Sequence, residues 1–546
     1  MQSERQNIWY AISLVALFAL FAFRLGKHVN DFYVPESDFF DFRAKAVSLR
    51  NFEWPDSFKR PPLYPAAIAA VSAFIPGKDR ELYAAELIGV LAALASLFLF
   101  YKIAAHFWGR NAVLLAWLWA LHPSTLRMAI KPKSEILVTV LILWALYLFL
   151  KEKKWAYAVA FAASCVRYEG ALIIAAIGAA DFFTRRDKLK TIVWSLLAGA
   201  FIVIWTALQS GGGDGESYFS YFNDYKPNFA FLRSFWEAMI GFLPDALHKY
   251  NVLLFALVMM LGYIYGFQKQ RRSIIALGVF FVGFLAMHIA WPMPNFDYQV
   301  LIVWNALLAF GFGIAWVAGQ KRFVSRVAAL INNKIVIILA ALALFAVVIF
   351  LTNRASPFPQ YHVSPWEWLV AAIPAVLALV AFWGSEYRIK LAPFLLAMLL
   401  LLPVLFAMLS DANALFYSIR YSKAEFRLVG EWFRENAEKG DKLVVEQPAI
   451  VAYYAELSDE HFVHLVDVPR TTPDSLYAWC GENGVTHVAW LSANRIFETD
   501  NAWYQWKMNN RGWSTISFLE KGIDSHGFVL LKRIKIGPRL ALVYKI

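Results

Sequence analysis

Charged residues are scarce in this chain, and their scarcity excludes a soluble domain of ordinary surface polarity. Only 17% of the 546 residues are Asp, Glu, Lys or Arg, whereas 60% are hydrophobic, and the mean hydropathy is +0.49. The formal net charge is +12, but basic residues of membrane proteins usually gather in cytoplasmic loops. We therefore predict a polytopic membrane protein whose surroundings are a lipid bilayer and which does not bind nucleic acid.

Cysteine and the common cofactor motifs are also lacking. The two cysteines, Cys165 in an apolar run and Cys480 in a polar tail, imply no disulfide framework. No His or Cys spacing indicates zinc or haem, and no Gly-rich phosphate fingerprint occurs, since "GENG" at 481–484 is more typical of a helix end. The sequence identifies no definite cofactor, and a divalent cation, Mg or Mn, is the one candidate.

Long apolar runs are what the chain has in abundance, and about thirteen of them are predicted to be transmembrane helices. They lie near residues 8–25, 84–107, 111–123, 134–151, 155–166, 169–184, 190–208, 250–267, 273–291, 298–318, 334–352, 367–384 and 390–411. The two helices on either side of residues 167–169 are predicted as separate spans. A single merged helix would place charged residues at mid-membrane, which costs on the order of several kcal/mol for each residue.

Loop charge predicts the topology. With a cytoplasmic N-terminus, the strongly basic short loops, such as 151–154 and 185–188, all fall on the cytoplasmic side of the plasma membrane. The first outer loop, 26–83, and the second long outer loop, 209–249, then lie on the extracytoplasmic side. We expect a transmembrane module over 1–411, followed by an extracytoplasmic domain over 412–546.

The composition after residue 411 is that of a water-soluble domain. "EFRLVGEWFREN", "AIVAYYAEL" and "DSLYAWCGENG" have helical patterns, and "KLVVEQ", "FVHLV" and "VTHVAWL" have strand patterns. This alternation predicts a small α/β domain with a parallel sheet.

Ionisable residues are missing from the centres of most spans, whereas transporters and pumps usually place partnered charges or broken helices there. The charges gather instead at the predicted outer mouth. They are Asp38, Asp41, Arg43, Lys45, Lys59, Arg60, Arg127, Lys131, Lys133, Glu135, Arg167 and Glu169. Each of them alone is equally well explained as an interfacial anchor or a solvated loop residue, but the group as a whole suggests a site.

The stretch "ESDFFDFRAKAV" (36–47) predicts an amphipathic helix with an acidic face. Phe39, Phe42, Ala46 and Leu49 share one side of a 3.6-residue period, and the opposite side is made of Asp38, Asp41, Lys45 and Ser48. A carboxylate beside cations at a lipid headgroup surface suits proton removal from a hydroxyl while the cations bind a lipid phosphate. If that phosphate carries a sugar, displacement at the anomeric carbon needs one base and little acid assistance, because phosphate is a stable leaving anion.

Two acids qualify as that base, Asp38 or Asp41. Glu135 follows "HPSTLRMAIKPKS" and begins a span, so it is a candidate to orient the acceptor or to help hold a divalent cation. An acidic residue in the first turn of a helix explains Glu135 equally well.

Several motifs in order resemble one family. "SDFFDFRAKAVSLRN" with "FKRPPLYPAAIAA", then "WGRNAVLLAWLWALHP", "KSEILVTVL" and "VRYEGALI" resemble the GT-C glycosyltransferases that use polyprenyl-phosphate sugars, the group with protein O-mannosyltransferases and the lipid A aminoarabinose transferase. The resemblance covers the first two hundred or so residues by motif and the later spans by topology alone.

The resemblance implies a GT-C fold and an inverting transfer of a hexosyl or pentosyl unit at the outer membrane face, with Asp38 as the base. Residues near the mouth would bind the lipid phosphate and the sugar, namely Lys59, Arg60, Tyr64, Arg127, Lys131, Lys133, Arg167 and Glu169. Any metal would be held by Asp38 and Glu135. The acceptor is left open between a protein, a lipid glycan and a cell-wall polymer.

Two departures from the family pattern limit the residue roles that the resemblance implies for this chain. Many members have Asp-Glu where this chain has Asp38-Phe39, so the role of a second acid passes to Asp41 or to no residue. Members often have Arg-Tyr before a late span, where this chain has Asp297-Tyr298.

A transporter or lipid flippase that forms no glycosidic bond is the main alternative function, and a non-catalytic membrane scaffold is a third.

Overall fold

The computed structural model divides the chain into two compact units. Unit 1 comprises Met1–His28 with Lys45–Phe416, and unit 2 comprises Val29–Ala44 with Tyr417–Ile546. The residues that the structure describes are 14–15, 17–19, 21–23, 25, 34–35, 37–53, 60–109, 112–185, 187–211, 245–290, 298, 300–319, 422–469, 472–494, 513–537 and 539–546. The boundary between the units falls inside one helix, α2 (Ser37–Arg50).

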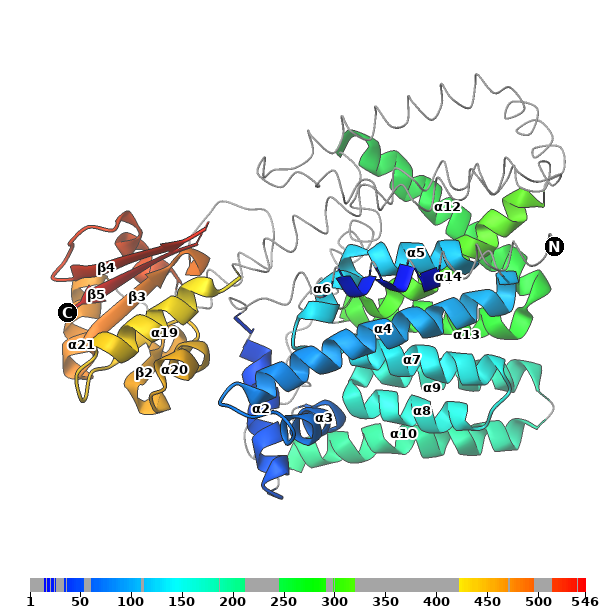
Figure 1. The fold of residues 1–546 in the computed structure, drawn as a ribbon, viewed down its shortest axis with the longest axis horizontal. Helices are drawn as coiled ribbons and strands as arrows, with labels where there is room; N and C mark the ends of the chain where they lie inside the picture. Colours follow the sequence, from blue (N-terminus) through cyan, green and yellow to red (C-terminus); the bar gives the residue numbers. More distant parts are fainter. Residues whose placement is uncertain are drawn as a thin grey trace. The chain divides into compact units, whose positions relative to one another are not determined.

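Unit 1 is helical throughout its described part. Its elements are α3 (Leu63–Ser72), α4 (Arg80–Trp108), α5 (Ala112–Leu121), α6 (Pro123–Ile130), α7 (Glu135–Leu150), α8 (Trp155–Val166), the 3-10 turn η2 (Tyr168–Gly170), α9 (Ala171–Thr184), α10 (Lys188–Gly211), α12 (Asp245–Lys269), α13 (Arg271–Ala290) and α14 (Val300–Ala318). In Figure 1, α4, α7, α8, α9 and α10 run side by side in a stack. Direct packing joins α4 to α7, α7 to α8, and α9 to α13.

Three of the described helices are long and apolar enough to cross a membrane, over Arg80–Trp108, Lys188–Trp205 and Arg271–Ile289. A fourth span is possible if α6 and α7 count as one, although they are bent by 118°. The predicted spans from residue 334 onward lie outside the described residues, so the number thirteen stays a prediction.

Two chain breaks shape unit 1 around its polar residues. The predicted split near 167–169 is confirmed, because α8 ends at Val166 and α9 begins at Ala171. Between α6 and α7 lies Pro132, which lacks a backbone N–H and disfavours helix at the residue before it. Helix α6 itself was not predicted, since its eight residues carry too few apolar positions to look like a span.

Unit 2 contains a five-stranded sheet in the order β2-β1-β3-β5-β4. The strands are β1 (Leu443–Val445), β2 (Phe462–His464), β3 (His487–Leu491), β4 (Val529–Ile536) and β5 (Arg539–Lys545). Strand β1 pairs in parallel with β2 and β3, whereas β5 is antiparallel to both β3 and β4. The predicted parallel sheet is therefore wrong for its last two strands, because the short link between β4 and β5 permits only an antiparallel hairpin.

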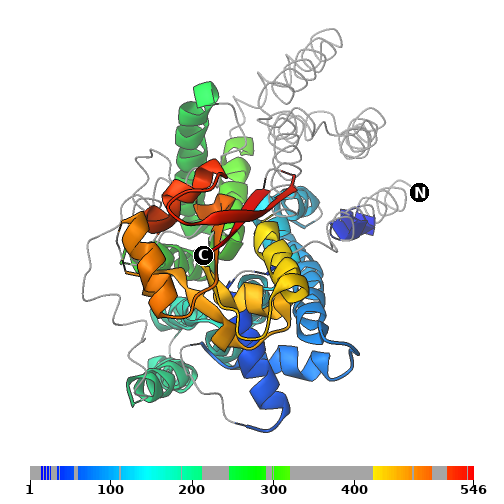
Figure 2. The same cartoon turned by 90° about the vertical axis from the view of Figure 1, so that its left-hand side faces the viewer.

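Helices cover both faces of this sheet (Figure 2). On one face lie α19 (Ala424–Asn436) and α20 (Pro448–Ala455), and on the other lie α21 (Pro473–Glu482) and the 3-10 helix η8 (Trp513–Lys521). Helix α19 presents Phe426, Val429 and Phe433 to the sheet at the spacing of one amphipathic stripe. Two separate hydrophobic clusters, one on each face, form the core of the unit.

The helix predicted in the first outer loop is present as α2, although its polar and apolar residues are less clearly segregated than predicted. Phe39, Phe42 and Ala46 are buried as expected, and Asp41 is exposed. Lys45 was assigned to the wet face but is buried, so the polar face is interrupted in the second half of the helix.

Candidate functional site

The guanidinium of Arg167 is the centre of a buried polar network in unit 1. Its Nη2 lies 2.8 Å from Glu169 Oε1, and its Nε donates to Glu169 Oε2 at 3.1 Å. Its Nη1 lies 3.1 Å from Glu135 Oε1 and also donates to Ser134 Oγ at 3.1 Å. One side chain therefore holds two carboxylates from different helix ends.

Local backbone geometry explains how these groups meet. Arg167 has an extended backbone, with φ −154° and ψ 151°, so it ends α8 and turns its side chain out of the helical register. Glu169 follows within η2, and Glu135 is the first residue of α7. Helix α7 packs against both α8 and η2, which brings the two acids to the same guanidinium.

The network is electrostatically self-consistent. Burial by itself raises the pKa of Glu169, but the charge and hydrogen bond of Arg167 outweigh it, so the pKa is lowered. Burial by itself lowers the pKa of Arg167, but Glu135 and Glu169 raise it well above its usual value. Both groups lie in the break between α8 and α9, and both are charged at neutral pH.

An aromatic ring completes the surroundings of Arg167. The Tyr298 ring lies just before α14, and its centroid is 5.0 Å from the guanidinium carbon. Neither this contact nor the Ser134 hydrogen bond was predicted. Ser134 occupies the N-cap position of α7 but makes no side-chain capping hydrogen bond there, and no sequence pattern indicated its contact with Arg167.

Tyr64, on α3, belongs to the same neighbourhood. Its side chain is buried, and its pKa is raised well above the usual value by burial first and then by the charges of Glu135 and Glu86, while Lys133 lowers it. Charges shift a pKa in this way only at short range. Tyr64 therefore lies within electrostatic range of Glu135 and Lys133.

The remaining predicted binding residues of unit 1 are basic. Lys131 and Lys133 are buried in the link between α6 and α7, and Arg127 is half-buried on α6. Arg60 is half-buried shortly before α3. Lys59 lies outside the described residues.

The two candidate bases belong to the other unit. Asp38 is half-buried and Asp41 is exposed, and both lie in the first half of α2, within unit 2. They are three residues apart and so share one face of the helix. Their role as the base stays a prediction.

A metal site finds no support from a cluster of ligands. The sequence offers Asp38 and Glu135 as ligands, but Asp38 is in unit 2 and Glu135 is in unit 1. Within the ranges that the structure describes, no group of three or more His, Cys, Asp or Glu side chains could hold a metal ion. A divalent cation, Mg or Mn, stays a prediction.

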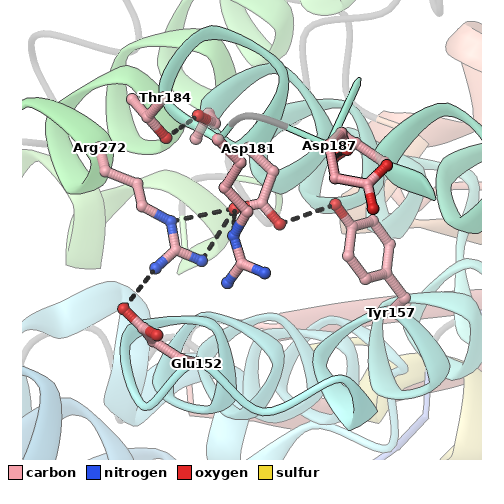
Figure 3. Close-up of polar contacts among 9 residues, drawn as sticks. Glu152, Tyr157, Asp181, Thr184, Asp187 and Arg272 are labelled. Atoms are coloured by element: carbon pink, nitrogen blue, oxygen red, sulfur yellow. Dashed lines mark hydrogen bonds and ion pairs between the residues drawn. The ribbon is translucent and has the colours of Figure 1, made fainter. Parts of the chain in front are cut away.

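A second buried polar cluster in unit 1 has a different character (Figure 3). Asp181 is contacted at Oδ1 by Arg272 Nη2, at 2.8 Å, and by Arg185 Nε, at 2.9 Å, and it accepts a hydrogen bond from Tyr157 at 3.2 Å. Arg272 also lies 3.5 Å from Glu152. These contacts fasten α8, α9 and α13 together beside the loops predicted to be cytoplasmic, and we interpret the cluster as a structural clamp.

Comparison with known proteins identifies the fold. No protein-family model matches the chain, and a search of curated proteins finds no match either. Among solved structures, the chain resembles ArnT from Cupriavidus metallidurans bound to undecaprenyl phosphate, with a TM-score of 0.55 and 12% identity over 99% of this chain and 98% of that one. The chain has the same fold as ArnT.

Further solved structures give weaker likenesses. ArnT in the apo state matches the chain with a TM-score of 0.50 and 12% identity, over 99% of this chain and 98% of that one. The oligosaccharyltransferase AglB from Archaeoglobus fulgidus, in complex with an inhibitory peptide and a dolichol-phosphate, has a TM-score of 0.49 and 12% identity, over 89% of this chain and 69% of that one. The likeness to ArnT supports the fold that the motifs predicted.

Proposed function

We propose that this GT-C protein is an integral-membrane glycosyltransferase, which moves a sugar from a polyprenyl-phosphate donor to an acceptor at the extracytoplasmic membrane face. The observation that carries the proposal is the buried network of Arg167, Glu135 and Glu169 beside Tyr64 and Lys133, in a chain with the fold of ArnT. ArnT was solved with undecaprenyl phosphate, which is a lipid phosphate of the proposed donor class.

The basic side chains around the α6–α7 link would bind the donor phosphate. Arg127, Lys131 and Lys133 come from one short stretch directly before Glu135, and charge-assisted hydrogen bonds to phosphate are stronger than neutral ones. Arg60 and Lys59 would add charge from the first outer loop. Arg167 would act mainly by holding Glu135 and Glu169 in place, since both are already bound to its guanidinium.

The reaction would be a single displacement with inversion at the anomeric carbon. Asp38 takes the proton of an acceptor hydroxyl, the acceptor oxygen bonds to the anomeric carbon, and the bond from that carbon to the phosphate oxygen breaks. The electron pair leaves with the polyprenyl phosphate, whose charge the bound cations stabilise. Glu135 would orient the acceptor or help hold a divalent cation if the reaction uses one.

Asp38→Asn tests the base assignment. We expect the variant to fold and to bind polyprenyl phosphate as the parent does, but to lose transfer, measured with labelled polyprenyl-phosphate sugars and a panel of protein, lipid-glycan and cell-wall acceptors. Asp41→Asn asks whether the second acid shares the role. Glu53→Gln is the matched control, because Glu53 is an exposed acid of the same outer loop.

Two outcomes would count against the proposal. Full transfer by Asp38→Asn would remove Asp38 as the base. Movement of the donor lipid between leaflets with no new glycosidic bond, in the parent protein and across the whole acceptor panel, would favour the transporter or flippase alternative.

A further inference from the structure

The first outer loop contributes to the hydrophobic core of the C-terminal unit. Val34 is 1% exposed and belongs to the same buried cluster as Phe426 and Val429 of α19 and Ile450 of α20. Phe40, in the first turn of α2, packs against this cluster from its edge. The segment before and within α2 is therefore a structural element of the C-terminal domain, although it comes from the other end of the sequence.

One aromatic side chain on α20 holds two residues of α2. The rings of Phe40 and Tyr453 meet edge to face, with centroids 5.5 Å apart. The guanidinium carbon of Arg43 lies 5.0 Å from the centroid of the same Tyr453 ring. Phe40 and Arg43 are three residues apart, so the Tyr453 ring contacts two consecutive turns on one side of the helix.

Helix geometry relates this anchored side to the acids. At about 100° per residue, Phe40 and Arg43 point in directions about 60° apart, and Asp38 and Asp41 point in directions about 60° apart on nearly the opposite side. Fixing the first pair therefore fixes the direction of the second. A slip of the helix by one residue would turn both carboxylates by about 100°.

We propose that the C-terminal domain positions the acidic face of α2 through Tyr453 and is thereby a required part of the transfer machinery. Tyr453 acts as a positioning residue, since its ring contacts Phe40 and Arg43 of α2. The importance of the acidic face for transfer rests on the proposed function. The anchoring of α2 by Tyr453 is independent of the proposed function, because it follows from the contacts of Tyr453 with Phe40 and Arg43.

The anchor matters because α2 has little stability of its own. It has 14 residues, and isolated helices of that length are marginal in water. A general base must also be held close to its reactive geometry, and a displacement of about 1 Å can lower a rate about 100-fold. Loss of the Tyr453 ring should therefore lower the rate of transfer more than it lowers donor binding.

The test compares Tyr453→Ala with Tyr453→Phe in the full-length protein. Tyr453→Ala removes both ring contacts, and we expect kcat to fall at least about tenfold while KM for the donor stays within about twofold, because the donor cations are elsewhere. Tyr453→Phe keeps the ring and should restore most of kcat. The matched control is Tyr477→Ala, which removes a half-exposed tyrosine from α21 on the opposite face of the sheet.

Hydrogen exchange supplies a readout that does not depend on catalysis. Amides of 37–50 should exchange faster in Tyr453→Ala than in the parent or in Tyr477→Ala, whereas the β1 and β3 amides should not change. Phe40→Leu, which keeps an apolar side chain but loses the ring, should reproduce the faster exchange if Tyr453→Ala does not fold. Unchanged exchange in α2 together with unchanged kcat would overturn the inference. Faster exchange in Tyr453→Ala together with no transfer by the parent protein to any acceptor of the panel would refute only the proposed function.

Discussion

Replacement of Arg167 by methionine should be among the most destabilising single changes in unit 1. The substitution keeps an unbranched apolar stem but removes the cation shared by Glu135 and Glu169. Glu135 is 3% exposed and Glu169 is 8% exposed, so water cannot replace the guanidinium without opening the helix break. Removing one partner of a buried ion pair typically costs about 3–5 kcal/mol, because the remaining charge stays buried.

Arg167→Lys separates charge from geometry. The ammonium keeps the positive charge but loses the planar fork that contacts both oxygens of Glu169, and it also loses the stacking against Tyr298. We expect a loss of roughly 1–2 kcal/mol, the value of one or two charge-assisted hydrogen bonds. A triple variant with Arg167→Met, Glu135→Gln and Glu169→Gln should recover part of the loss, since it buries no unpaired charge.

Thermal unfolding of the purified protein in lipid nanodiscs measures this series. The order of unfolding temperatures should be parent, then Arg167→Lys, then Arg167→Met, with the triple variant above Arg167→Met. Because the folded pKa of Glu169 lies below its ordinary value of 4.5, the advantage of the parent should be complete above about pH 5 and should shrink as pH falls through the folded pKa. Equal unfolding temperatures for the parent and Arg167→Met at pH 7 would refute the claim that the network holds ionised carboxylates.

Two further predictions concern sites away from this network. The pKa of His487 on β3 is lowered, mainly by burial and also by Lys545, although Asp441 acts in the opposite direction. Unit 2 should therefore lose stability as pH falls below about 6.5. A pH series of unfolding curves should show that His487→Phe removes this dependence. Asp181→Asn should destabilise unit 1 by roughly 1–2 kcal/mol in denaturant unfolding, because Asp181 is buried and its pairs with the partly exposed Arg272 and Arg185 lose their charge. Asp187→Asn breaks the exposed pair with Lys190 but keeps a side-chain oxygen for the backbone N–H of Lys190, so it should leave unfolding nearly unchanged. An equal effect of the two variants would contradict the clamp in Figure 3.

The sequence predicted those features that follow from a clear hydrophobic periodicity or from a large free-energy cost of the alternative. The helix over 37–50 follows from its apolar spacing, and the break at Arg167 follows from the cost of placing charges at mid-membrane. The helices and first three strands of unit 2 also match their predicted patterns. In each of these cases, local sequence alone decides between the alternatives.

Features that depend on tertiary contacts could not be predicted from the sequence. Helical periodicity assigned Lys45 to the wet face, yet packing buries it. The meeting of Glu135 with Arg167 depends on the packing of α7 against α8 and η2, which sequence spacing does not reveal. The membership of Val34 in the C-terminal core likewise needs a contact between distant parts of the chain, for which no local pattern exists.

Unit 2 is formed by two segments that lie far apart in the sequence, and this constrains the order in which the candidate site can form during folding. Contacts between residues far apart in sequence carry a high loop-closure entropy and form late in folding. Val34 and Phe40 cannot take their places until α19 and α20 have been made, so the acidic face of α2 is oriented only after most of the membrane module exists. A chain that ends before α19 would therefore hold the Arg167 network but would lack the anchor that orients Asp38 and Asp41.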